Sequence, residues 1–165
     1  MDFKIRPATA DDAECLARLR YEFRVGFSET TESEPEFLER CEQWMANRLS
    51  DKSQWRCWVA EYEGQFIGNA WLQLIEKIPN PAVEPELHGY LTNFFVREKM
   101  RNRGVGSKLL KIALDYCNAS GVHAVFLWPT DESRTLYISH GIGPTTLIFA
   151  KHLSPAEQTK GKCDE

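Results

Sequence analysis

Residues 88–118 read HGYLTNFFVREKMRNRGVGSKLLKIALDYCN, and this stretch decides the fold. A strand-like run, His88–Val96, leads through the glycine turn Arg101–Gly106 into a helix-like run, Ser107–Asn118. The first amides of a helix have no internal partner, and the helix dipole adds partial positive charge to them. A glycine-rich turn that opens a helix can therefore hold an anion, and two arginines lie in this one. We expect a phosphate-bearing ligand here; a turn whose glycines serve only packing is the alternative.

Hydrophobic periodicity and turn signals predict an α/β domain with the order β-α-α-β-β-β-α-β-α-β. The early hairpin, with its turn at Glu63-Gly64, implies a mixed sheet. Ala124–Trp128 is nearly all apolar, which is typical of a strand buried on both faces. The expected strands are Phe3–Arg6, Arg56–Tyr62, Gln65–Ile75, His88–Val96, Ala124–Trp128 and Thr146–His152. The expected helices follow Thr9, follow the acidic link Ser28–Glu36, span Ser107–Asn118, and run from Thr130 or Asp131 to His140.

Length and composition exclude several classes of protein. The 165 residues fit one domain, 1–153, followed by a polar tail, 154–165. A net charge of −4 argues against a nucleic-acid partner. The five cysteines form no CxxC pair, so no metal site is expected and a reducing cytoplasm is the natural compartment. Because the chain has neither a signal-like start nor a long apolar run, we expect no membrane association.

Two common phosphate-binding loops do not match the turn. A Walker A loop needs Gly-Lys followed by Ser or Thr, but here Ser107 precedes Lys108. A dinucleotide fingerprint needs a third glycine where Leu109 stands, and it normally occupies the first βα turn of its domain. The turn is therefore neither of these.

Residues 90–110, YLTNFFVREKMRNRGVGSKLL, resemble the acetyl-CoA-binding motif of the GNAT superfamily of N-acetyltransferases. That motif has Arg or Gln, two residues, Gly, one residue, and then Gly or Ala. It follows a strand that ends in valine and precedes an amphipathic helix. In this chain the corresponding residues are Arg101, Gly104 and Gly106, with Val96 at the end of the strand.

The resemblance extends beyond the turn. Ile5–Thr9 with Asp11-Asp12 is similar to the opening of the family, and Leu136-Tyr137 followed by Gly141-Ile142 is similar to its last conserved helix. These segments occur in the right order and cover most of the chain. The family fold is a twisted mixed sheet with flanking helices, in which the fourth and fifth strands splay apart to admit acetyl-CoA.

The resemblance implies which residues bind acetyl-CoA as cosubstrate, with no metal. The backbone of Phe94, Phe95 and Val96 would bind the pantetheine arm, and an N–H near Val96 would polarise the thioester carbonyl. Thr130 stands where the family often has a CoA-contacting asparagine, and Ser133 is a substitute for it. The amides that would hold the pyrophosphate belong to Arg101, Asn102, Arg103, Gly104, Val105, Gly106 and Ser107.

By the same resemblance, Tyr137 is the general acid that protonates the departing thiolate, whereas residue type alone favours a tyrosine that packs on the core. A phenol with a pKa of about 10 stays protonated at neutral pH and can donate to sulfur. The base remains open. Some family members carry a glutamate in the fifth strand that this chain lacks, so the base candidates are Glu84, Glu86 and His88, or a water wire. Solvated loop residues are the alternative for all three.

The acceptor is expected to be the amine of a small molecule. If the acidic residues near the first two helices and before the fourth strand form a wall, a cationic amine is favoured. These residues are Glu29, Glu32, Glu34, Glu84 and Glu86. Two alternative functions remain, a protein N-terminal or lysine acetyltransferase and a non-catalytic acetyl-CoA sensor. The alternative to the acidic wall is that these glutamates only solvate loops. A homodimer would complete an acceptor pocket left open by the short C-terminal part.

Overall fold

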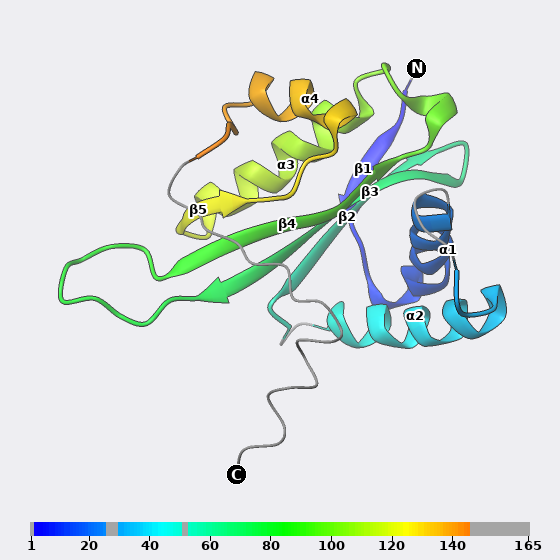
Figure 1. The fold of residues 1–165 in the computed structure, drawn as a ribbon, viewed down its shortest axis with the longest axis horizontal. Helices are drawn as coiled ribbons and strands as arrows, with labels where there is room; N and C mark the ends of the chain where they lie inside the picture. Colours follow the sequence, from blue (N-terminus) through cyan, green and yellow to red (C-terminus); the bar gives the residue numbers. More distant parts are fainter. Residues whose placement is uncertain (1, 26–29, 51–52, 146–165) are drawn as a thin grey trace, which may run out of the picture.

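A five-stranded mixed sheet forms the centre of the protein in a computed structural model that describes residues 2–25, 30–50 and 53–145 (Figure 1). The strands lie in sequence order across the sheet. Neighbours from β1 to β4 are antiparallel, whereas β4 and β5 are parallel. The strands are β1 (Lys4–Pro7), β2 (Trp55–Tyr62), β3 (Gln65–Glu76), β4 (Leu87–Val96) and β5 (Val122–Phe126).

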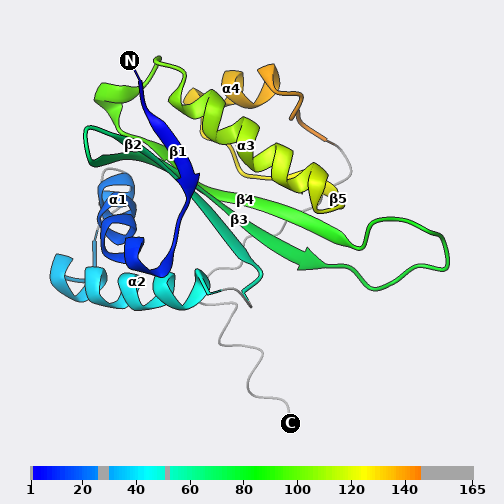
Figure 2. The same ribbon diagram turned by 180° about the vertical axis from the view of Figure 1, so that it is seen from behind.

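Two pairs of helices cover opposite faces of this sheet (Figures 1 and 2). The helices α1 (Ala13–Val25) and α2 (Glu34–Arg48) pack on one face, where Leu16, Cys41 and Trp71 are buried together. The helices α3 (Val105–Ala119) and α4 (Arg134–Ser139) pack on the other. Short 3₁₀ turns precede α1, α3 and α4: η1 (Ala10–Asp12), η2 (Glu98–Met100) and η3 (Asp131–Ser133). The described part of the predicted order is confirmed.

Helix capping fixes the starts of the first two helices. Asp12 accepts a hydrogen bond from the backbone N of Thr9 at 2.8 Å and two more from the guanidinium of Arg6. In α2, Ser33 and Glu36 form the reciprocal capping box, and a proline occupies the first turn. The acidic link therefore ends at Ser33, three residues earlier than predicted, because Glu36 caps the helix instead of belonging to the link.

The prediction that β5 is buried on both faces is wrong. His123 and Ala124 are exposed, and the strand itself begins at Val122 and ends at Phe126. In the described chain β5 pairs only with β4, so it is the last strand of the sheet there and its other edge has no strand partner. The predicted strand Thr146–His152 and the predicted tail lie outside the described residues. No helix in the described ranges is long and apolar enough to cross a membrane.

Candidate functional site

The two parallel strands separate halfway along β4. Their pairing runs from Leu87↔Val122 to Tyr90↔Phe126, where β5 ends. The strand β4 continues for six more residues, Leu91–Val96, which have no β5 partner in the described chain. Figure 1 shows the two strands diverging there. One edge of this segment is therefore available to an extended ligand that hydrogen-bonds as an added strand would.

A β-bulge lies within the separated part of β4. The register with β3 shifts between Asn69 and Trp71, and Asn93 has a φ of 45°. The Nδ2 of Asn69 donates a hydrogen bond of 2.6 Å to the carbonyl oxygen of Asn93. From α1, Arg20 donates to the Oδ1 of Asn93 at 3.3 Å. Sequence reasoning missed Arg20, Asn69 and Asn93. The available signal was an asparagine within a run of strand-forming residues, because Asn tolerates positive φ.

The glycine turn presents a row of backbone amides at the start of α3. Asn102 and Gly104 both have positive φ, 58° and 80°. Gly104 is the N-cap residue and no side chain caps the helix, whose first internal bond runs from the Lys108 amide to the Gly104 carbonyl at 3.0 Å. The amides of residues 105–107 therefore have no partner within the helix. The Nε of Arg101 donates to the carbonyl of Val96 at 3.1 Å, which ties the exposed turn to the end of β4.

Gly106 also has a packing role. A Cβ at this position would lie 3.3 Å from the Cδ2 of Leu136 and 3.7 Å from the Cε1 of Phe94. The first of these distances is tighter than ordinary van der Waals contact, so glycine lets α4 pack directly on the start of α3. The packing alternative for this glycine therefore holds together with its proposed role in anion binding.

Tyr137 is the buried residue of α4 and lies beside the gap. Only 7% of its surface is exposed, and its ring centroid is 5.8 Å from that of Phe94 in an edge-to-face arrangement. Burial raises the pKa of its phenol from 10.0 to about 12, while a hydrogen bond with Ser133 opposes the shift. The hydroxyl of Ser133 also donates to the carbonyl of Thr130 at 2.9 Å. The structure thus brings Phe94, Thr130, Ser133 and Tyr137 together.

The three base candidates lie away from this cluster. Glu86 precedes Phe94 by eight residues, which is about 26 Å along an extended strand. His88 lies in the part of β4 that pairs with β5, and its ring centroid is 5.8 Å from that of His123. Glu84 accepts hydrogen bonds from Lys77 and Asn80, which lower its pKa and make it a weaker base. Glu84 and Glu86 line a hollow with Lys77, Ser120 and Gly121.

Two of the glutamates of the predicted acidic wall form ion pairs with basic residues of the chain. Glu32 forms an ion pair with Arg40 at 2.6 Å, and Glu84 forms one with Lys77 at 2.7 Å. Glu34 is the first residue of α2. Glu29 lies outside the described residues. The charges of Glu32 and Glu84 are therefore already compensated within the chain.

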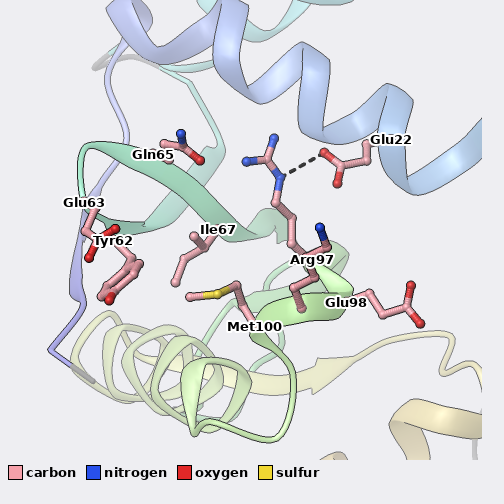
Figure 3. A pocket seen from close by; sticks show the side chains of 9 residues that line it. Glu22, Tyr62, Glu63, Gln65, Ile67, Arg97, Glu98 and Met100 are labelled. Carbon is pink, nitrogen blue, oxygen red and sulfur yellow. Dashed lines mark hydrogen bonds and ion pairs between the residues drawn. The ribbon is translucent and has the colours of Figure 1, made fainter.

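A second hollow lies at the other end of the sheet (Figure 3). The ion pair between Glu22 of α1 and Arg97 after β4, 3.0 Å long, borders it (Figure 3). Its remaining lining comes from the β2–β3 hairpin and η2: Tyr62, Glu63, Gln65, Ile67, Glu98, Lys99 and Met100. None of the residues predicted to bind the cosubstrate lines it. No three His, Cys, Asp or Glu side chains of the described ranges gather as a metal ion would require.

Comparisons with known proteins agree with this geometry. Residues 16–141 match the model of the acetyltransferase (GNAT) family. A predicted acetyltransferase from Clostridium acetobutylicum, solved with acetyl-CoA, superposes with a TM-score of 0.78 at 19% identity, covering 92% of this chain and 96% of that one.

Two further structures are similar. A GCN5-related N-acetyltransferase from Ralstonia eutropha JMP134 has a TM-score of 0.74 at 25% identity, covering 92% of this chain and 99% of that one. A glucosamine-6-phosphate N-acetyltransferase from Arabidopsis thaliana has a TM-score of 0.68 at 19% identity, with coverages of 93% and 100%. Because the family model spans well over half of the sequence, and the mixed sheet with its separated fourth and fifth strands matches, the chain belongs to the GNAT family of acetyltransferases.

Proposed function

We propose that this protein is an acetyl-CoA-dependent N-acetyltransferase that moves an acetyl group directly to the primary amine of a small molecule. The observation that carries the proposal is that the unpaired segment Leu91–Val96 of β4 is tied, through Arg101 and Val96, to the turn whose free amides begin α3. A ligand with an amide-bearing arm and a pyrophosphate, which is what acetyl-CoA is, matches both of these parts.

The residues fit this cosubstrate. The backbone of Phe94, Phe95 and Val96 is positioned to bind the pantetheine arm. The amides of residues 101–107 are positioned to bind the pyrophosphate, because Asn102 and Gly104 adopt the left-handed conformation that turns successive amides toward one side. Thr130 and Ser133 offer hydroxyls at the start of α4.

The chemistry is a direct acyl transfer. The neutral amine nitrogen attacks the thioester carbon, a C–N bond forms, and the C–S bond breaks with its electron pair going to sulfur. A β4 backbone N–H near Val96 stabilises the negative charge that develops on the carbonyl oxygen. The phenol of Tyr137, which is protonated at neutral pH, gives its proton to the thiolate and recovers one from solvent. The proton lost by the amine passes to water, because Glu84, Glu86 and His88 are remote.

A thiol-release assay tests the proposal. Free CoA thiol is measured with acetyl-CoA and a panel of amines, peptides and aminoglycosides, against a blank that lacks the acceptor. We expect release that depends on a small amine. Binding of acetyl-CoA without release across the whole panel would favour a sensor, and release with peptides alone would favour a protein acetyltransferase.

A glycine substitution tests the cosubstrate site. In the Gly106→Val variant the added side chain meets Leu136 and crowds the amides, so the affinity for acetyl-CoA falls by about 10-fold or more. Gly143→Val is the matched control, because a Cβ there meets nothing within 4 Å. Calorimetric titration with acetyl-CoA measures both variants, and an equal affinity for the two would contradict the assigned site.

A further inference from the structure

A half-buried arginine, Arg20, faces the separated part of β4 and has no carboxylate partner among residues 2–25, 30–50 and 53–145. Arg20 donates to the Oδ1 of Asn93, and no carboxylate of the described residues is within ion-pair distance of its guanidinium. Neighbouring arginines differ: Arg18 pairs with Glu14 at 2.9 Å, and Arg40 pairs with Glu32. A partly desolvated cation without a counterion is unfavourable unless a ligand supplies the negative charge.

Among the described residues, the one full charge that acts on the pKa of Arg20 is positive. Burial and the nearby charge of Arg24, one helical turn further along α1, lower the pKa of Arg20. Cys41 and Tyr90 act in the opposite direction, and neither is a carboxylate. The guanidinium also lies over the ring of Phe23, 5.8 Å from its centroid. A cationic acceptor that entered here would be repelled by both arginines, whereas an anion would be attracted.

The position of Arg20 places this charge on the acceptor side of the gap. Its partner Asn93 is the bulge residue directly before Phe94, whose backbone is assigned to the pantetheine arm. Phe94 packs toward α4 and Tyr137, whereas Phe95 stacks on Phe23 of α1, with ring centroids 5.2 Å apart. The guanidinium is therefore on the α1 face of β4, opposite the proposed acid.

An aromatic wall borders the same face. It consists of Tyr90, Phe126 and Trp128, whose ring centroids lie 5.0–5.8 Å from one another. Tyr90 pairs with Gln73 of β3, which lies two residues from Trp71 and so points to the α1 and α2 face. Trp128 is 57% exposed, so the wall offers flat apolar surface to a ligand.

We propose that Arg20 binds a carboxylate of the acceptor, and that the acceptor is an amine with a carboxylate and an apolar, flat body held by the aromatic wall. This inference rests on the proposed function and names its substrate class. A guanidinium pairs with a carboxylate through two parallel hydrogen bonds, which would orient the amine toward the thioester. The positive charge also favours the unprotonated amine, which is the nucleophile.

Calorimetry on the full chain with CoA present tests the inference independently of turnover. The probes are phenylalanine, its amide, and phenethylamine, which share the aromatic body and the amine and differ in the carboxylate. We expect wild-type protein to bind phenylalanine about 50-fold more tightly than the amide or phenethylamine, the range for a hydrogen-bonded charge pair. The Arg20→Gln variant should lose this preference, and Arg18→Gln, with the same change of charge on the same helix, should retain it.

The outcomes separate the inference from the proposed function. If wild-type protein binds the acid no better than the amide, or if Arg20→Gln keeps the preference, the inference is overturned whatever the enzyme acetylates. Binding of the acid with the expected preference but without thiol release would support the carboxylate site and contradict the acetyltransferase function. Acetylation of spermidine in preference to phenylalanine would also overturn the inference.

Discussion

Replacing Tyr137 by phenylalanine should separate the chemistry of this site from its architecture. The substitution keeps the ring that packs against Phe94 and removes only the hydroxyl. Loss of a positioned general acid typically costs 10²–10⁴-fold in rate, and water can protonate a thiolate in part, so we expect kcat to fall by about 10²-fold. The KM for acetyl-CoA should change by less than about two-fold, because the amides of the glycine turn are untouched.

The same variant has a stability signature that follows from burial. Because the pKa of Tyr137 rises from 10.0 to about 12 in the folded protein, its contribution is fully present below pH 10 and is lost as the pH rises toward 12. At pH 11 the wild-type protein has lost about 1.4 kcal/mol through this group. Tyr137→Phe has no phenol to ionise at this position. The difference in unfolding free energy between the wild-type protein and the variant should therefore decrease by about 1.4 kcal/mol between pH 8 and pH 11.

Tyr116→Phe serves as the control. The hydroxyl of Tyr116 accepts a hydrogen bond of 2.8 Å from the Nε of Arg56 and lies on the sheet-facing side of α3, away from the gap. Its removal should cost about 1 kcal/mol of stability with no loss of turnover. Steady-state kinetics and urea unfolding measure both variants. If Tyr137→Phe turns over like wild type, the general-acid role is refuted; if only the alkaline stability difference is missing, the phenol is less buried than the structure places it.

Two further substitutions test the supports of the site. Asn69→Leu leaves the carbonyl of Asn93 without its 2.6 Å hydrogen bond, so the free energy of unfolding should fall by about 1–2 kcal/mol. We also expect kcat/KM, measured by steady-state kinetics beside thermal melts, to fall by more than the loss of folded protein explains. An unchanged kcat/KM would show that the bulge has no role in catalysis. Asp12→Asn should cost about 2 kcal/mol at neutral pH. Because Arg6 lowers the pKa of Asp12 below 3.8, this difference should shrink as the pH falls below that value, and a difference that persisted in acid would contradict the ion pair.

The donor half of the site could be predicted because it is made of backbone. A strand, a turn with Gly104 and Gly106, and an amphipathic helix each leave a local signature, and the order of these signatures determines the direction of the amides. The bulge at Asn93 could not be predicted in the same way. It depends on Asn69, twenty-four residues earlier, and on Arg20 from a different helix, and these contacts exist only after the sheet has formed.

Errors in the prediction also have physical causes. The apolar run Ala124–Trp128 indicated a strand buried on both faces, but hydrophobicity alone does not say what covers a strand. In the described chain Phe126 and Trp128 belong to the aromatic wall, and both side chains remain at least partly exposed. The acidic wall before α2 and β4 was predicted from charge alone. In the fold Glu32 forms an ion pair with Arg40, and Glu84 forms one with Lys77.

The two halves of the site therefore follow different rules. Backbone amides bind a pantetheine arm and a pyrophosphate whatever the side chains are, so the donor can be kept constant while the sequence around it changes. The proposed acceptor site consists of side chains from three separate elements: Arg20 on α1, Tyr90 on β4, and Phe126 and Trp128 at the end of β5. We expect a single substitution at Arg20 to remove the preference for a carboxylate while the backbone amides at the start of α3 stay in place. It follows that the acceptor of a chain with this fold is better inferred from unpaired charges beside the β4 bulge than from the total charge of its loops.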